Sequence, residues 1–181
     1  MFYLISGGSG SGKSEFAENI AVKLYNKEKK EKEQGLFYIA TMMGTDLETL
    51  EKIERHRTMR REKGFVTLEC FTDLKSAFIT SAPSDGTILL DCLSNLVANE
   101  MFSEHGVKEH IVEEVLQGVE YLLEKCNHLV IVTNEIFSDG CDYDNTTKQY
   151  IRNLGQLNQN LAKRADKVVE VVYGIPVYHK K

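Results

Sequence analysis

Short apolar runs alternate along this chain with longer amphipathic stretches. Several runs, such as Ile88-Leu89-Leu90, are continuously apolar, which is typical of strands covered on both faces of a sheet. The pattern predicts strands at 2–6, 36–41, 66–69, 87–91, 128–133 and 167–172, with a short one at 175–179. It predicts helices at 13–31, 46–61, 107–125 and 146–164. Strands that alternate with helices in this way favour a mostly parallel sheet.

A glycine-rich segment separates the first predicted strand from the first predicted helix. Its sequence, GGSGSGKS at residues 7–14, fits the pattern G-x-x-x-x-G-K-[ST] in the strand-to-helix setting that a phosphate-binding loop needs. Glycines let successive N–H groups face phosphate oxygens, and the helix N-terminus adds positive potential. We expect Lys13 to reach the β- and γ-phosphates and the Ser14 hydroxyl to ligate Mg²⁺. A flexible linker is the alternative, but linkers rarely lie between a buried strand and an amphipathic helix.

The fold class predicted from these features is α/β. We expect a RecA-like P-loop NTPase fold, with a mostly parallel central sheet flanked by helices, in one domain over residues 1–181.

Ligands of open parallel sheets gather at the carboxyl ends of the strands. Asp91 ends an apolar strand there and is a candidate Mg²⁺ ligand, although an Asp in this place can also simply cap the next helix. Thr133-Asn134-Glu135 ends another strand and could either face the phosphates or a second substrate, or form a turn.

A basic stretch of the second predicted helix carries His56. Its neighbours in sequence are arginines, and guanidinium groups lower the pKa of an imidazole and keep it neutral and nucleophilic. Such a histidine could attack an α-phosphate and form a phosphoramidate. Taken by its spacing alone, the stretch is also explained as a solvated basic face of the helix.

Composition narrows the partners and the compartment. The chain of 181 residues has a net charge of −5, which gives no basic footprint for a nucleic acid. Its four cysteines are widely spaced, without a metal-ligand or redox pattern, and Cys70 and Cys92 are expected to be small core residues. No leader and no apolar run of membrane length is apparent, so a cytoplasmic enzyme is expected.

Several motifs, in one order along nearly the whole chain, resemble the bifunctional adenosylcobinamide kinase/adenosylcobinamide-phosphate guanylyltransferase family. They are GGSGSGKS, Phe37-Tyr38-Ile39-Ala40-Thr41, Ile53-Glu54-Arg55-His56-Arg57, TILLDCLSN at 87–95, Val132-Thr133-Asn134-Glu135 and GQLNQNLA at 155–162. The phosphate loop is common to many families, whereas the histidine-bearing segment and the Thr-Asn-Glu strand end discriminate. The chain departs from the family pattern at 136–143 and at Gln156, where the family has Arg.

The resemblance implies two reactions with GTP and ATP as substrates and Mg²⁺ as cofactor. A nucleoside triphosphate would phosphorylate the corrinoid adenosylcobinamide. GTP would then donate GMP to an enzyme histidine and on to the phosphorylated corrinoid. The guanylylated histidine falls on His56, with Lys13 as the second catalytic residue. The nucleotide-contacting positions fall on Gly7, Gly8, Ser9, Gly10, Ser11, Gly12, Lys13, Ser14, Ala40, Thr41, Met42, Arg57, Thr58, Met59, Arg60, Glu69 and Asp91.

The resemblance also implies a homotrimer. The net charge and the lengths of the apolar runs, as noted above, argue against a nucleic-acid partner and against a membrane span. Two other hypotheses stay open from the sequence. One is a P-loop kinase that acts on another hydroxyl substrate and has no guanylyl step. The other is a nucleotide-dependent switch or ATPase that acts through a protein partner, although no dedicated partner helix is evident.

Overall fold

A mixed, mostly parallel sheet forms the centre of the molecule. The computed structural model describes residues 1–28, 35–44, 54, 57–58, 60–78, 86–137 and 140–181. The described strands are β1 (Phe2–Ser6), β2 (Leu36–Ala40), β3 (Val66–Glu69), β4 (Gly86–Asp91), β5 (Cys126–Val132), β6 (Lys167–Val172) and β7 (Ile175–Lys180). They confirm the seven predicted strands, with ends that differ by no more than two residues.

The strand order places one strand between the phosphate loop and Asp91. The sheet runs β3-β2-β4-β5-β1-β6-β7, and each neighbouring pair is parallel except β6 and β7, which are antiparallel. Strand β5 therefore separates β1, which leads into the phosphate loop, from β4, which ends at Asp91. The predicted mostly parallel, RecA-like P-loop architecture is confirmed.

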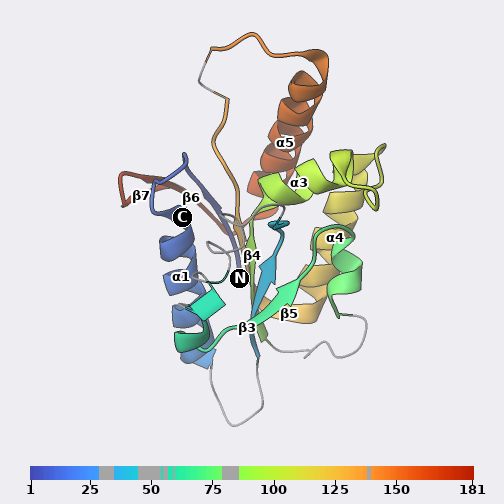
Figure 1. Cartoon of the computed structure of the whole chain (residues 1–181). Coiled ribbons are helices and arrows are strands. Elements are labelled where there is room, and N and C mark those ends of the chain that lie inside the picture. Colours follow the sequence, from blue (N-terminus) through green and yellow to red (C-terminus); the bar gives the residue numbers. More distant parts are fainter. Residues whose placement is uncertain (29–34, 45–53, 55–56, 59, 79–85, 138–139) are drawn as a thin grey trace.

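Helices cover both faces of this sheet (Figure 1). Helix α1 (Lys13–Glu28) packs on one face, against β4 and β5. The short 3₁₀ helix η1 (Leu74–Phe78) and the helices α3 (Leu93–Phe102), α4 (Ile111–Lys125) and α5 (Asn145–Arg164) pack together on the other face. Two apolar cores follow from this arrangement, one on each side of the sheet.

The predicted helices agree with the structure in part. Helix α5 begins one residue before its predicted start and ends where predicted. Helix α4 begins at Ile111 rather than at 107, because Lys108 and His110 have left-handed backbone angles, with φ of 63° and 54°. Most of the predicted helix at 46–61 lies outside the described residues, although 57–58 and 60–62 are helical.

Helix α3 and the short η1 were absent from the prediction. Leu93, Leu96, Val97 and Glu100 are all buried, and their spacing of three and four is helical. The signal was therefore present, but it begins immediately after a strand, and a helix after Asp91 was considered only as an alternative role for that residue, without being predicted.

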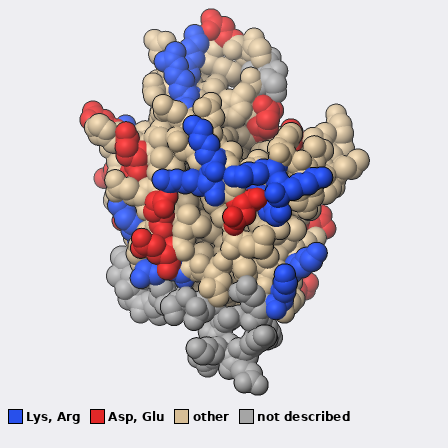
Figure 2. Space-filling model, turned by 180° about the vertical axis from the view of Figure 1, so that it is seen from behind, with Lys and Arg blue, Asp and Glu red and all other residues tan. Residues whose placement is uncertain are grey.

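The surface shows mixed charge rather than a basic field. On the face seen in Figure 2, a short row of Lys and Arg side chains crosses the middle, with Asp and Glu side chains close by. Within the described ranges, no helix combines the length and the apolar character that a membrane span needs.

Candidate nucleotide-binding site

The glycine-rich segment curls tightly between β1 and α1. A Cβ on Gly7 would lie 2.5 Å from the Ser11 hydroxyl oxygen and 2.6 Å from the Val171 carbonyl oxygen, so only glycine fits there. Gly12 adopts a φ of +88°, which side-chain-bearing residues rarely adopt, and its carbonyl accepts the hydrogen bond from Phe16 N–H that opens α1. The loop thus ends at the positive end of a 16-residue helix.

Lys13 lies at the junction of this loop and α1. Its side chain is 9% exposed, and its Nζ donates to the Gly8 carbonyl at 3.0 Å, which holds the ammonium group over the loop. The hydroxyl oxygen of Ser11 is buried without a hydrogen-bond partner. The backbone N–H of Gly174, in the turn between β6 and β7, donates to the Ser11 carbonyl at 2.8 Å. The loop is therefore fixed to the sheet and has polar groups available for a ligand.

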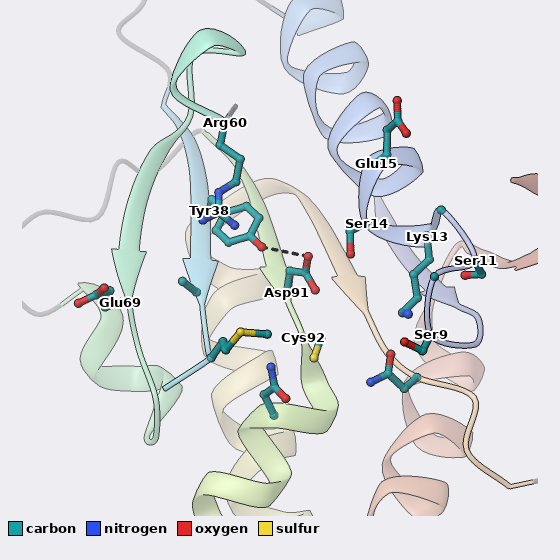
Figure 3. Close-up of a pocket in the computed structure, with 16 residues that line it drawn as sticks. Ser9, Ser11, Lys13, Ser14, Glu15, Tyr38, Arg60, Glu69, Asp91 and Cys92 are labelled. Carbon is teal, nitrogen blue, oxygen red and sulfur yellow. Dashed lines mark hydrogen bonds between the residues drawn. The ribbon is translucent and has the colours of Figure 1, made fainter. Parts of the chain in front are cut away.

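A cavity of about 490 Å³ opens in front of the loop (Figure 3). It lies at the carboxyl ends of the strands, as expected for an open parallel sheet. Its lining comes from the loop and α1, from β2 and the residues after it, from the ends of β3, β4 and β5, from the start of α3, and from the helical residues 60–62. The lining residues are Ser9, Gly10, Ser11, Gly12, Lys13, Ser14, Glu15, Tyr38, Ala40, Met42, Arg60, Glu69, Asp91, Cys92, Asn95 and Asn134.

Asp91 and Ser14 line this cavity from different elements. Asp91 ends β4, and its Oδ2 accepts a hydrogen bond of 2.9 Å from the Tyr38 hydroxyl. Figure 3 shows the Asp91 carboxylate on the side of the cavity that faces Ser14 and Lys13. A hydroxyl and a carboxylate are hard oxygen donors, the type that Mg²⁺ takes, usually together with phosphate oxygens and water. The two predicted metal ligands therefore fit that ion chemically.

Two arginines of the basic segment, Arg57 and Arg60, have different surroundings. Arg57 is half-exposed and pairs with the carboxylates of Glu54 and Glu69. Arg60 is only 5% exposed, lines the cavity, and places its guanidinium 3.7 Å from the centroid of the Tyr38 ring. Its Nε is buried without a hydrogen-bond partner. Arg60, rather than Arg57, is thus the arginine available to an anion in the cavity.

Most of the predicted contact positions are brought together, and a few are not. Ser9 to Ser14, Ala40, Met42, Arg60, Glu69 and Asp91 all line the cavity. Thr41 does not: it is fully buried, and its hydroxyl donates to the Cys92 carbonyl and accepts from the Cys92 N–H. Four predicted positions lie near the cavity without lining it: Gly7, Gly8, Arg57 and Thr58. Gly8 accepts the hydrogen bond from Lys13, and Thr58 donates to the Glu54 carbonyl. His56 and Met59 lie outside the described residues.

The strand end Thr133-Asn134-Glu135 combines both roles considered for it. Asn134 lines the cavity, and its amide donates to the Ser94 hydroxyl at 2.7 Å. Thr133 is buried and donates to the Asn158 side chain, whereas Glu135 accepts from the Phe137 N–H in a turn. Asn134 alone of these three faces the candidate ligand.

Four cavity residues were not among the predicted contacts: Glu15, Tyr38, Cys92 and Asn95. Cys92 was considered only as a core residue. It is indeed buried, and burial raises the pKa of its thiol, so the thiol stays protonated. Cys70 is also buried, as expected, and burial raises its pKa to about 11. Tyr38 reads as a core position within an apolar strand, so only its packing against Asp91 and Arg60 reveals its place in the site.

Comparisons with known proteins find relatives that match nearly the whole chain. A family model described as "Cobinamide kinase / cobinamide phosphate guanyltransferase" matches residues 3–178. The chain is 29% identical over 189 residues to the bifunctional adenosylcobalamin biosynthesis protein CobU of Salmonella typhimurium, with 98% of each chain covered. It is 30% identical over 176 residues to CobP of Pseudomonas aeruginosa, a protein of the same description, covering 96% of this chain and 94% of that one.

A solved structure supports the fold alone. The flagellar accessory protein FlaH from Methanocaldococcus jannaschii superposes with a TM-score of 0.50 at 15% identity. The match covers 99% of this chain and 77% of FlaH.

Proposed function

The chain belongs to the cobinamide kinase/cobinamide phosphate guanyltransferase family, and from this premise we propose that it carries out both reactions. First, a nucleoside triphosphate phosphorylates the hydroxyl of adenosylcobinamide. GTP then gives GMP to His56, and adenosylcobinamide phosphate takes it to form adenosylcobinamide-GDP. The observation that carries the proposal is a single cavity bordered by the phosphate loop, by Asp91 and by the buried cation Arg60.

Phosphoryl transfer depends mainly on positioning and on neutralising charge. The loop N–H groups and the Lys13 ammonium hold the β- and γ-phosphates, while the substrate hydroxyl approaches the γ-phosphorus in line with the leaving group. The acceptor reaches the cavity from the side lined by Asn95 and Asn134, whose amides can bond to a polar substrate.

Nucleotidyl transfer through a histidine divides one displacement into two. A ring nitrogen of His56 attacks the α-phosphorus of GTP, the bond to the β-phosphate breaks, and pyrophosphate leaves. A phosphate oxygen of the phosphorylated corrinoid then attacks the same phosphorus, and the P–N bond breaks. Arg60 follows His56 by four positions in the sequence and lines the cavity, so its charge can stabilise the α-phosphate in both displacements.

Magnesium completes the site in this proposal. The ion would be held by the Ser14 hydroxyl and the Asp91 carboxylate, and when bound it would neutralise charge on the phosphates. Within the described part of the chain, no group of three His, Cys, Asp or Glu side chains gathers as a metal cluster. In this proposal the protein would contribute the two oxygen ligands of Ser14 and Asp91, and phosphates and water would supply the others.

The experiment is a product analysis. The purified protein is mixed with adenosylcobinamide, ATP, GTP and Mg²⁺. The corrinoid products are then separated and identified by mass spectrometry. We expect the phosphate to appear first, followed by the GDP conjugate with one pyrophosphate per conjugate. The His56→Ala variant should form adenosylcobinamide phosphate but no GDP conjugate. The matched control His105→Ala, at an exposed position, should form both products as the wild type does.

Two outcomes would contradict the proposal. Phosphorylated corrinoid without any conjugate would leave a kinase that lacks the guanylyl step. Absence of any corrinoid product from a folded, nucleotide-binding preparation would favour a nucleotide-dependent switch or ATPase, and a partner retained only with nucleotide would support that alternative.

A further inference from the structure

Tyr38 connects the acid and the buried cation of the cavity. It lies on β2, is 4% exposed and lines the cavity wall opposite the phosphate loop (Figure 3). Its hydroxyl donates to Asp91 Oδ2 at 2.9 Å, and its ring receives the Arg60 guanidinium at 3.7 Å from the centroid. Phe65 packs edge-on against the same ring, with centroids 6.0 Å apart. One side chain thus contacts two charged groups of opposite sign.

The hydroxyl of Tyr38 orients the Asp91 carboxylate. A phenol can donate one hydrogen bond, and the Tyr38 hydroxyl donates it to Asp91 Oδ2. This bond restricts the rotation of the carboxylate, and Tyr38 does not contact Oδ1 through it. Burial and the neighbouring Asp91 charge raise the pKa of Tyr38 well above its ordinary value. The hydrogen bond from the phenol thus orients the Asp91 carboxylate.

The guanidinium of Arg60 packs on the ring of Tyr38, where a carboxylate would be the usual partner. A buried guanidinium normally needs a hydrogen-bonded counter-ion. Among the described residues no carboxylate pairs with Arg60, and its Nε has no partner, whereas Arg57 in the same segment has two carboxylates. The electron-rich face of the ring compensates part of this cost and leaves the positive charge unneutralised toward the cavity. An anion in the cavity would meet that charge.

We propose that Tyr38 is a positioning residue for Mg²⁺–nucleoside triphosphate: its hydroxyl presents Asp91 to the ion, and its ring presents Arg60 to the phosphates. The inference rests on the proposed function, since it takes the cavity ligand to be a nucleoside triphosphate. It separates two effects that can be removed one at a time. Tyr38→Phe deletes the hydroxyl but keeps the ring, and Tyr38→Leu deletes both.

Calorimetric binding of a non-hydrolysable GTP analogue, with EDTA or with Mg²⁺, distinguishes the two effects. In EDTA, Tyr38→Phe should bind as the wild type, whereas Tyr38→Leu and Arg60→Met should each bind roughly ten-fold more weakly. The double variant Tyr38→Leu/Arg60→Met should be no weaker than either single variant, because the ring acts through Arg60. With Mg²⁺, Tyr38→Phe should lose about ten-fold of the affinity that the ion adds in the wild type.

Tyr3→Phe is the matched control, because Tyr3 lies on β1, away from the cavity lining, and it should bind as the wild type under both conditions. Full Mg²⁺-dependent affinity in Tyr38→Phe would overturn the role of the hydroxyl. Wild-type affinity of Arg60→Met in EDTA would overturn the role of the ring, even if Tyr38→Leu does not fold. A wild-type protein that binds no nucleotide would instead refute the proposed function, so the two failures are distinguishable.

Discussion

Two cations face the cavity from opposite walls, and they depend on their surroundings in different ways. Lys13 lies over the phosphate loop and donates to a loop carbonyl, whereas Arg60 rests on an aromatic ring. Both are nearly buried, so a bound triphosphate would interact with them in a medium less polar than water, where charge–charge attraction is stronger.

Lys13→Ala tests the first of these cations. Removing the ammonium group should weaken binding of the GTP analogue by about ten-fold or more and slow both proposed reactions, because a charge-assisted hydrogen bond to the phosphates is lost. Calorimetry and the two product assays measure this. Lys23→Ala, an exposed lysine on the same helix, is the control. Equal affinity of Lys13→Ala and Lys23→Ala for the analogue would contradict the role assigned to Lys13.

At this scale the sequence predicts some site residues and leaves others hidden. Lys13 and Ser14 follow from a motif whose spacing is tied to phosphate geometry, and Asp91 follows from its place at a strand end. Tyr38 and Thr41 were misjudged in opposite directions. The β2–β4 pairing, which sets Ala40 beside Asp91, decides whether a polar side chain on β2 or just after it faces the cavity or bonds to the backbone. No local sequence pattern specifies that register.

Among the elements, α5 shows how one side chain sets a helix start. Asp144 precedes the helix, and its Oδ1 accepts from the N–H groups of Thr146 and Thr147 at 2.8 and 3.0 Å. Its Oδ2 accepts from the Thr147 hydroxyl at 2.7 Å. Hydrogen bonds from Thr147 are the main cause that lowers the pKa of Asp144 below its ordinary value. The negative charge also lies at the positive end of the helix dipole.

The stability supplied by this cap should depend on pH. Because the folded pKa of Asp144 is lowered, its contribution is complete above the ordinary value of 3.8 and is lost as the pH falls through the folded value. Urea unfolding at neutral pH should therefore find Asp144→Asn less stable than the wild type, and the difference should vanish towards about pH 2. A difference that stays constant over this range would show that the charge of Asp144 does not act.

Element boundaries were predictable where sequence alone carries the signal. Asp144 is an N-cap residue by type, and the β-strands are apolar runs of the expected length. The start of α4 was predicted too early, because the left-handed backbone at Lys108 and His110 has no signature in the residue types there. Helix α3 was missed because it follows β4 with only Cys92 between them.

For the whole molecule, the sheet order explains how distant segments meet. Residues of β2, β3 and β4 on one side and the phosphate loop after β1 on the other converge at the same edge, across the end of β5. The alternation of strands and helices predicted this edge as the ligand site, as a general property of open parallel sheets. The order of the strands in the sheet required the structure.

We also propose, from family resemblance, that the enzyme is a homotrimer and acts in the cytoplasm. Static light scattering after gel filtration should give a mass of about three times the chain mass of 20.6 kDa. The hairpin of β6 and β7 carries exposed apolar side chains, among them Tyr173 and Ile175, which such an assembly could cover. A mass equal to that of one chain, at concentrations where both reactions proceed, would refute the trimer.

The most direct test of the account is covalent labelling by GTP. The protein is incubated with GTP labelled in the α-phosphate and with Mg²⁺, denatured in alkali to preserve a phosphoramidate, and digested for peptide mapping. The account predicts one labelled GMP on His56, released by pyrophosphate or by the phosphorylated corrinoid, and none on His56→Ala. A folded preparation that binds GTP but takes no label, or takes it at another residue, would contradict nucleotidyl transfer through His56.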